Sequence, residues 1–318
     1  MTRALALVVL ACPVFAQAPA STHDPSAARV ISADISRFWH VFDGLPQDSA
    51  SLAKSGAVFQ RGYIDSGSVG LHDFVDRRIR SGDHLAAVVA AHARYYGAIR
   101  RNTLSVDTAT RVRDAIRVSF RRLAALCPEA VFPDVYFLIG AMSSAGTASP
   151  HGLLIGVEMN ARDDATPIDE LDAWHRAVVG RVADLPFIVA HELIHIEQRP
   201  MDSEPTVLDV ALHEGGADFV GELISGGLIN RVQHAYGDAH EAKLMAEFSR
   251  ARDTKHLADW FYQGDKAKDR PADLGYYEGY KIAEAYYRRA PDKTAAVCRI
   301  MRGTDARDLL RQSGYAPR

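Results

Sequence analysis

The sequence has few cysteines and a small net charge, and each of these features argues against a class of protein. Three cysteines among 318 residues are too few for a disulfide-stapled scaffold. The formal charge is −3 and no run of lysine and arginine occurs, which argues against a nucleic-acid partner or an anionic-membrane surface. A hydrophobic content of 47% with 24% charged residues is typical of a folded globular chain.

The first residues are predicted to be a signal peptide, residues 1–18. A short basic start is followed by an apolar stretch and by small residues, and cleavage is expected after Ala16 or Ala18. The alternative is a lipoprotein site at Cys12, which would leave a very short apolar region. No later segment reaches the length of a membrane span. We therefore expect an exported protein, periplasmic or secreted, with no stable membrane insertion after cleavage.

Composition and periodicity divide the remaining chain into three parts. Residues 19–29 are rich in Pro, Ser and Ala and are predicted to be a disordered lead-in. Residues 30–126 repeat apolar side chains at three- and four-residue steps, which predicts a helical N-terminal region. Residues 127–318 begin with two short apolar runs, 134–140 and 152–159, and each is predicted to be a strand.

The order of these segments predicts an α+β fold that is mostly helical, with a small sheet between two helical parts. The segment between the two strands, 141–151, is rich in Ser, Gly and Thr and is predicted to be a loop. Further helices are expected over 185–199, 207–224, 240–250 and 276–289.

Cys127 and Cys298 are the cysteines that follow the predicted signal peptide. They can pair in an oxidising compartment, but both lie in helical, apolar stretches, where single cysteines are most often simply buried. The sequence favours two buried thiols and leaves a disulfide as the alternative.

Residues 191–195, His-Glu-Leu-Ile-His, form an HExxH motif whose surroundings favour a metal site. About 0.02 occurrences are expected by chance. The flanking residues are apolar, so the helix is predicted to be buried, and buried His and Glu side chains need partners. His191 and His195 lie on one helical face within reach of one ion, while Glu192 can lean over an open coordination position without being a ligand. The alternative is a core helix whose histidines bond to backbone carbonyls.

A zinc site needs a third ligand, and Glu214 is the predicted one. The metzincin extension is absent, because Gln198 and Met201 occupy its positions. Glu214 follows the motif after 18 residues and shares a helical face with Asp218, which can accept a hydrogen bond from a ligand imidazole. His213 is the rival ligand, but it points about 100° away from Glu214.

Gly215 and Gly216 interrupt the helical pattern directly after this residue. Inside a helix each costs about 1 kcal/mol relative to alanine, so a packing reason is required. We expect that reason to be a close approach to the HExxH helix.

These motifs resemble those of a known family. HExxH, eighteen residues and then Glu-x-x-x-Asp is the gluzincin signature, shared by thermolysin-like proteases and, at this spacing, by zinc aminopeptidases. Residues 130–318 look like a group of exported bacterial proteins described as Zn-dependent proteases and built around a domain of unknown function. The resemblance is carried by 132–140, 143–159, 191–195, 214–226 and 274–280. It implies a gluzincin-like core, with a small mixed sheet whose edge strand runs beside the HExxH helix, and it supplies no substrate.

The resemblance also implies a Tyr or His that stabilises the oxyanion, several dozen residues beyond the third ligand. Tyr276 and Tyr280 share one helical face, 62 and 66 positions past Glu214, and a phenol O–H can donate one hydrogen bond to the developing charge. Core packing is the alternative for both tyrosines, and His240 is the next candidate.

The leading hypothesis is an exported zinc metallopeptidase that acts on a peptide or protein substrate. His191, His195 and Glu214 would hold Zn²⁺, and Glu192 would act as the general base toward an activated water. The alternatives are a non-catalytic zinc-stabilised envelope binding protein and a zinc hydrolase of a non-peptide substrate. No G-x-S-x-G occurs, which disfavours a serine hydrolase. The oligomeric state is not predicted.

Overall fold

The computed structural model describes residues 21–108, 110–303 and 305–316, and the predicted signal peptide lies outside them. The chain forms two compact units. The first unit holds residues 17–197 and 221–229, and the second holds 198–220 and 230–318. The division predicted at residue 126 is therefore not a unit boundary. Within the described ranges, no helix is both long enough and apolar enough to cross a membrane.

The first unit contains a four-stranded mixed sheet with the strand order β2-β4-β6-β5. The strands are β2 Val30–Ile31, β4 Val135–Leu138, β5 Gly146–Ser149 and β6 Gly152–Gly156. The first three strands of this order are parallel, and β5 pairs antiparallel with β6 at the edge. β4 and β6 are fully buried, as expected for the apolar runs from which they were predicted. The α+β class is therefore confirmed.

β5 lies inside the segment that the sequence predicts to be a loop. It consists of Gly-Thr-Ala-Ser and has no apolar alternation, so the composition gives no strand signal. Its strand geometry comes from pairing with β6, with Gly146 opposite Ile155 and Ser149 opposite Gly152. Tertiary pairing thus overrides the local signal.

Residues 21–29, part of the stretch 19–29 that composition predicts to be a disordered lead-in, contact the rest of the first unit. β1 (Ser21–Thr22) pairs antiparallel with β3 (Phe132–Pro133). The backbone N–H of Arg29 donates to the Asp134 carboxylate over 2.7 Å. The partners lie more than 100 positions along the chain, where composition does not reveal them.

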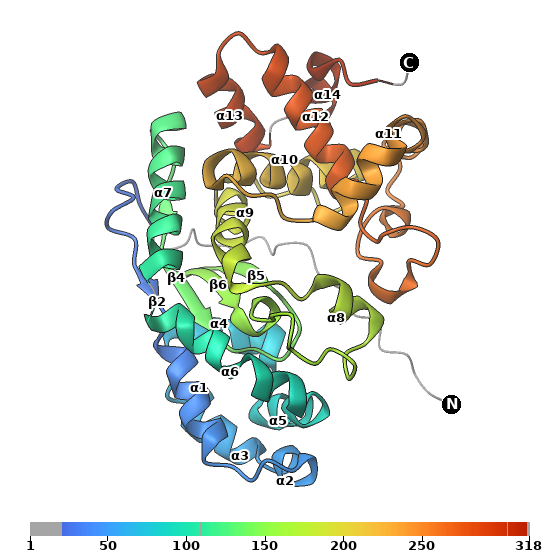
Figure 1. Cartoon of the computed structure of the whole chain (residues 1–318). Helices are drawn as coiled ribbons and strands as arrows, with labels where there is room; N and C mark the ends of the chain where they lie inside the picture. The colour runs from blue at the N-terminus through green and yellow to red at the C-terminus, as the bar shows by residue number, and fades with distance from the viewer. Residues whose placement is uncertain (1–20, 109, 304, 317–318) are drawn as a thin grey trace. The chain divides into compact units, whose positions relative to one another are not determined.

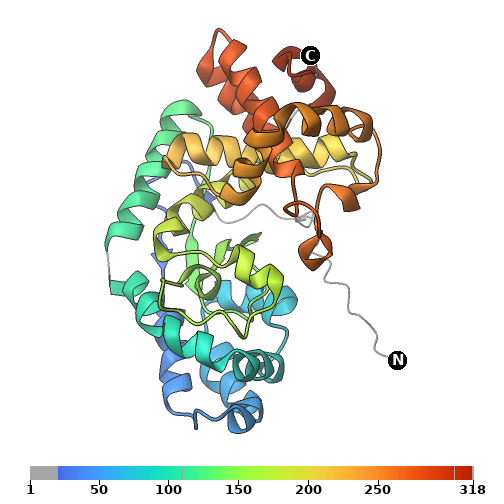
Figure 2. The same ribbon diagram turned by 45° about the vertical axis from the view of Figure 1, so that its right-hand side comes forward.

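Helices surround this sheet in the first unit (Figure 1). They are α1 Ala33–Asp43, α2 Ser49–Ala53, α3 Gly56–Phe59, α4 Val69–Phe74, α5 Gly82–Ala91, α6 Ala93–Thr108, α7 Thr110–Leu126, α8 Ala173–Val178 and α9 Leu185–Glu197. Helices α1 and α4 pack against β4, and α9 packs against β5 and β6. The long helix α7 lies alongside α9 in both views (Figure 1 and Figure 2).

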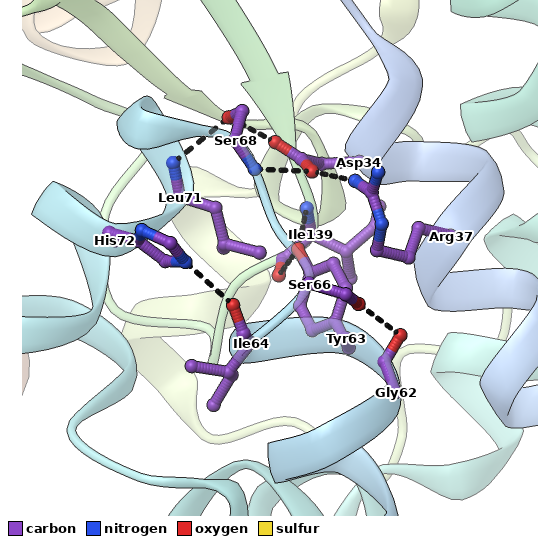
Figure 3. Close-up of polar contacts among 10 residues, drawn as sticks. All are labelled: Asp34, Arg37, Gly62, Tyr63, Ile64, Ser66, Ser68, Leu71, His72 and Ile139. Carbon is purple, nitrogen blue, oxygen red and sulfur yellow. Dashed lines mark hydrogen bonds and ion pairs between the residues drawn. The ribbon is translucent and has the colours of Figure 1, made fainter.

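A buried carboxylate ties α1 to the start of α4 (Figure 3). Asp34 is 1% exposed and accepts hydrogen bonds from the Ser68 hydroxyl at 2.5 Å and the Ser68 backbone N–H at 3.1 Å. It also pairs with Arg37 on its own helix. The Ser68 hydroxyl in turn caps α4 by accepting from the Leu71 N–H. These partners satisfy a charge that would be costly to bury alone.

The second unit is helical. Its elements include α10 Val207–Ser225, which ends in the first unit, α11 Arg231–Ala251, α12 Gly275–Arg289, α13 Lys293–Arg302 and α14 Ala306–Ser313. Helix α12 packs against α11, α13 and α14 (Figure 2). The helices predicted over 207–224 and 276–289 match α10 and α12. The one predicted over 240–250 is only the second part of α11, which is interrupted by non-helical angles at His240 (φ −131°, ψ 18°).

Both cysteines of the described ranges, Cys127 and Cys298, are disulfide-bonded. The interpretation that the sequence favours, two buried thiols, therefore does not hold. An apolar helical context is equally compatible with a thiol and with a half-cystine, so periodicity does not separate the two.

Candidate metal centre

Helix α9 carries the HExxH motif and is buried on almost all sides, as its apolar flanks predict. Its buried residues are Leu185, Pro186, Ile188, Val189, Ala190, His191, Leu193 and Ile194. Pro186 stands in the first turn, where a missing N–H breaks no helical hydrogen bond. His191 is 7% exposed and His195 is half-buried, so their ring nitrogens need polar or metal partners.

The two imidazoles of the motif converge on one point. The Nε2 atoms of His191 and His195 lie 3.0 Å apart, and the ring planes are 87° to one another. Two nitrogens bound to one tetrahedral zinc at about 2.0–2.1 Å would be about 3.3 Å apart. The spacing of four residues on α9 therefore places two ring nitrogens at a separation close to the one that two ligands of a single zinc ion would have.

Glu214 on α10 belongs to the same set of potential ligands. Within the part of the chain that is described, His191, His195 and Glu214 are grouped as residues that could hold a metal ion, each offering one ligand atom. Two imidazole nitrogens and one carboxylate are a ligand set of catalytic zinc sites, which keep a fourth position for water. The donor chemistry therefore fits zinc. His213, the rival ligand, is not in this group.

Glu192 lies against the edge strand. A Cβ atom added to Gly146 in β5 would lie 2.7 Å from both Cγ and Oε1 of Glu192, so any other residue there would require the Glu192 side chain to move from its present position. Glu192 is half-buried and is not among the grouped metal ligands of the described residues. Its role as a non-ligand general base stays a prediction.

Helix α10 makes backbone contact with α12, the helix that carries the two candidate tyrosines. A Cβ atom at Gly215 would lie 2.2 Å from the backbone nitrogen of Tyr280 and 2.5 Å from the carbonyl oxygen of Tyr276. A Cβ atom at Gly279 would lie 1.7 Å from the carbonyl oxygen of Ala211. Glycines on both helices therefore allow this close crossing.

The glycine pair was expected to allow a close approach to the HExxH helix, and this expectation was wrong. Gly215 approaches α12, and the added Cβ at Gly216 would lie 3.3 Å from the Ile300 side chain of α13. The glycine that meets the HExxH helix is Gly221, where a Cβ atom would lie 3.2 Å from the backbone nitrogen of His191. Glycines inside a helix indicate a close approach, but the sequence does not say to which neighbour.

Tyr276 faces acidic side chains of α10. Burial, together with the charge of Glu214, raises its pKa well above the usual value of 10, and the more weakly acting Asp218 adds to this effect. The phenol therefore keeps its proton at neutral pH and remains a hydrogen-bond donor. This is the property that an oxyanion-stabilising side chain requires.

His234 is a residue that the sequence analysis missed. It is 7% exposed on α11, and its ring lies 4.5 Å from that of Tyr280 and perpendicular to it. His240, the candidate considered instead, is exposed and stacks on Tyr236 at 4.1 Å. His234 has no motif around it, and only the tertiary structure brings it to α12.

Asp218 is 2% exposed and is held by a second residue without a sequence signal. Asn230 donates from Nδ2 to Oδ2 of Asp218 over 2.7 Å. Asn230 precedes α11 with φ of 53°, a left-handed conformation that asparagine tolerates better than most residues. The predicted hydrogen bond from a ligand imidazole to Asp218 stays a prediction.

Comparison with known proteins gives one family whose match covers the region that carries these residues. A family described as "Predicted Zn-dependent protease (DUF2268)" matches residues 179–304. The match supports the resemblance to Zn-dependent proteases that the motifs indicate. It covers α9 with the motif, α10 with Glu214 and Asp218, and α12 with Tyr276 and Tyr280. No curated protein and no solved structure matches the chain.

Proposed function

We propose that the protein is an exported zinc metallopeptidase with a gluzincin-like core. The observation that carries this proposal is the convergence of the His191 and His195 Nε2 atoms on α9, with Glu192 held beside the edge strand β5. The grouping of Glu214 with the two histidines and the match to Zn-dependent proteases support it.

In this proposal the chain's own residues have distinct tasks. His191 and His195 bind the ion through Nε2, and Glu214 binds it through a carboxylate oxygen. When bound, zinc lowers the pKa of a water molecule and polarises the substrate carbonyl. Glu192 accepts a proton from the attacking water and passes it to the leaving amine.

The oxyanion donor is proposed to be Tyr276. Its raised pKa keeps the phenol protonated, and the charge of Glu214 reaches its hydroxyl. Tyr280 and its neighbour His234 form the second candidate pair. Asp218 is proposed to orient a ligand imidazole, and Asn230 keeps its carboxylate in place.

Export is part of the proposal. The basic and apolar start of the sequence supports a signal peptide over residues 1–18. Disulfide bonding of Cys127 and Cys298 fits an oxidising compartment, where such bonds persist. A mature N-terminus following Ala16 or Ala18, found by mass spectrometry of protein from the native envelope, would support it; a lipid-modified Cys12 would contradict it.

The experiment that tests the enzyme is Glu192→Gln, assayed on a peptide library by mass spectrometry. The amide keeps the shape of the side chain but cannot take a proton, so turnover should fall about 10²–10⁴-fold while zinc content and melting temperature stay unchanged. Glu204→Gln makes the same chemical change at an exposed position and should have no effect. If wild type and Glu192→Gln are equally inert but bind the same envelope partner, the protein is a binding module instead.

A further inference from the structure

The loop between β4 and β5 is folded around a buried carboxylate. Glu158 is fully buried in the 3₁₀ turn that follows β6. Its Oε2 accepts the N–H of Gly140 at 2.8 Å, and its Oε1 accepts the N–H of Met142 at 3.3 Å. A carboxylate in this position is tolerated only with such donors, so the carboxylate and the loop (residues 139–145) hold each other in place.

The loop backbone is shaped to surround this carboxylate. A Cβ atom at Gly140 would lie 2.7 Å from Oε1 of Glu158, and one at Gly156 would lie 2.3 Å from the carbonyl oxygen of Ser144. Met142 adopts φ of 53°, which is uncommon for a residue with a side chain. Such a conformation persists where surrounding contacts fix it.

Buried phenols on the helices of the unit hold the start of the loop and the backbone of Glu158. Each donates a hydrogen bond to a backbone carbonyl: Tyr63 to Ile139 at 2.6 Å, Tyr96 to Gly140 at 2.8 Å and Tyr95 to Glu158 at 2.7 Å. The Tyr63 hydroxyl also accepts the Ile139 N–H at 2.9 Å (Figure 3). The loop therefore leaves β4 at a fixed point.

The other end of the loop meets the motif. The Gly156 N–H donates to the carbonyl of Ala145 at 3.1 Å, and the Ser144 hydroxyl donates to the carbonyl of Gly146 at 2.6 Å. Gly146 is the residue whose backbone lies against the carboxylate of Glu192. A short, hydrogen-bonded backbone segment thus connects the amides that Glu158 holds to the glycine that Glu192 touches.

We propose that Glu158 is a positioning residue for Glu192: by holding the loop, it keeps Gly146 where the Glu192 carboxylate is confined to one place beside the motif helix. The inference rests on the proposed function, because it assigns the effect to the general base. Glu158 is not a catalytic residue, since its oxygens contact loop amides and it acts through the loop.

The test is Glu158→Gln in the zinc-loaded protein at pH 8, where the Glu158 carboxyl, whose pKa burial raises to about 7, is mostly ionised in wild type. The amide nitrogen would replace one of the two acceptor oxygens, so a donor would face the N–H of Gly140 or of Met142. We expect kcat to fall about 10–100-fold with KM nearly unchanged and zinc retained at one per chain, because misplacing a reacting group by up to about 1 Å has effects of this size. The melting temperature is also expected to fall.

A matched control separates positioning from general destabilisation. Thr103→Val removes a buried hydrogen bond in the same unit, the one that Trp39 Nε1 donates at 2.7 Å, and the hydrogen-bond partners of the Thr103 hydroxyl, Trp39 and Arg100, lie outside the loop. It should lower the melting temperature but leave kcat unchanged. Gly146→Ala should reproduce the kcat loss directly, and the double variant with Glu158→Gln should lose little more than Gly146→Ala alone, since both act on one contact.

A second measurement keeps the inference testable if the peptidase proposal fails. The ¹³C chemical shift of the Glu192 carboxyl, assigned with Glu192→Gln, should change at fixed pH in Glu158→Gln and in Gly146→Ala but not in Thr103→Val. An unchanged shift in Glu158→Gln would overturn the positioning role whether or not the protein cleaves peptides. Equal kcat in wild type and Glu158→Gln, with only the melting temperature lowered, would also overturn it.

Discussion

Replacing Glu278 with glutamine should make the protein more stable than wild type at neutral pH. Glu278 is fully buried on α12. Burial raises the pKa of its carboxyl from 4.5 to about 8; the charge of Glu241 acts in the same direction, while Tyr315 and Lys281 oppose it. The folded protein therefore keeps this group neutral at pH 7, whereas the unfolded chain releases the proton.

The sign and size of the effect follow from this difference. Between pH 4.5 and about 8 the folded state binds more protons at Glu278 than the unfolded state, so the free energy of unfolding falls as pH rises through this range. At pH 7 the loss is about 3 kcal/mol, because each pKa unit is worth about 1.4 kcal/mol. Glutamine mimics the neutral form and cannot ionise, so the variant should not show this loss.

The assay is thermal unfolding of wild type and Glu278→Gln between pH 4.5 and 8. The difference in melting temperature should grow with pH and exceed its value at pH 4.5 by about 6 °C at pH 7, at roughly 2 °C per kcal/mol. Glu158, whose pKa burial raises to about 7, adds a dependence of the same sign to both proteins. Asp202→Asn, at an exposed position, is the control. Melting temperatures that move in parallel over this range would refute the reasoning.

Four further outcomes are expected. Glu214→Ala should lower zinc affinity sharply in a chelator-competition titration, whereas His213→Ala should leave it nearly intact; the reverse order would make His213 the ligand. Asp218→Asn should weaken zinc binding about 10–100-fold in the same titration, and an unchanged affinity would remove its role beside the ligands. Tyr276→Phe should reduce kcat about 10²-fold with zinc retained; a higher KM with unchanged kcat would argue for a role in substrate binding instead. Gly215→Ala should lower the melting temperature, because the added methyl meets backbone atoms of α12, and an unchanged value would contradict that close packing.

The metal motif could be predicted from the sequence because its determinants are local. The spacing of His191 and His195 fixes their common face in any α-helix, and the apolar residues around them indicate burial. β4 and β6 were predictable for a similar reason, since a buried strand is a short apolar run. In each case one turn or one strand carries the whole signal.

The remaining parts depend on partners that are distant in the chain. β5 has only small residues and becomes a strand by pairing with β6. The position of α11 in the folded chain brings His234 to Tyr280 of α12. It also brings Asn230, which precedes α11, to Asp218. The helix that packs against Gly215 could not be predicted either, because a glycine leaves room for a neighbour without specifying which one. The local pattern of apolar residues carries no information about such long-range contacts.

The crossing of α10 and α12 has a consequence for how this chain can change over evolutionary time. At Gly215 and Gly279 every other amino acid would place a Cβ atom within 1.7–2.2 Å of backbone atoms on the facing helix, and backbone cannot be moved aside by a rotamer change. Neither glycine has a functional group, yet substitution at either position should be selected against as strongly as substitution of a metal ligand. Among relatives of this protein, invariance at these two sites would record the distance between two helices and would be no evidence of chemistry.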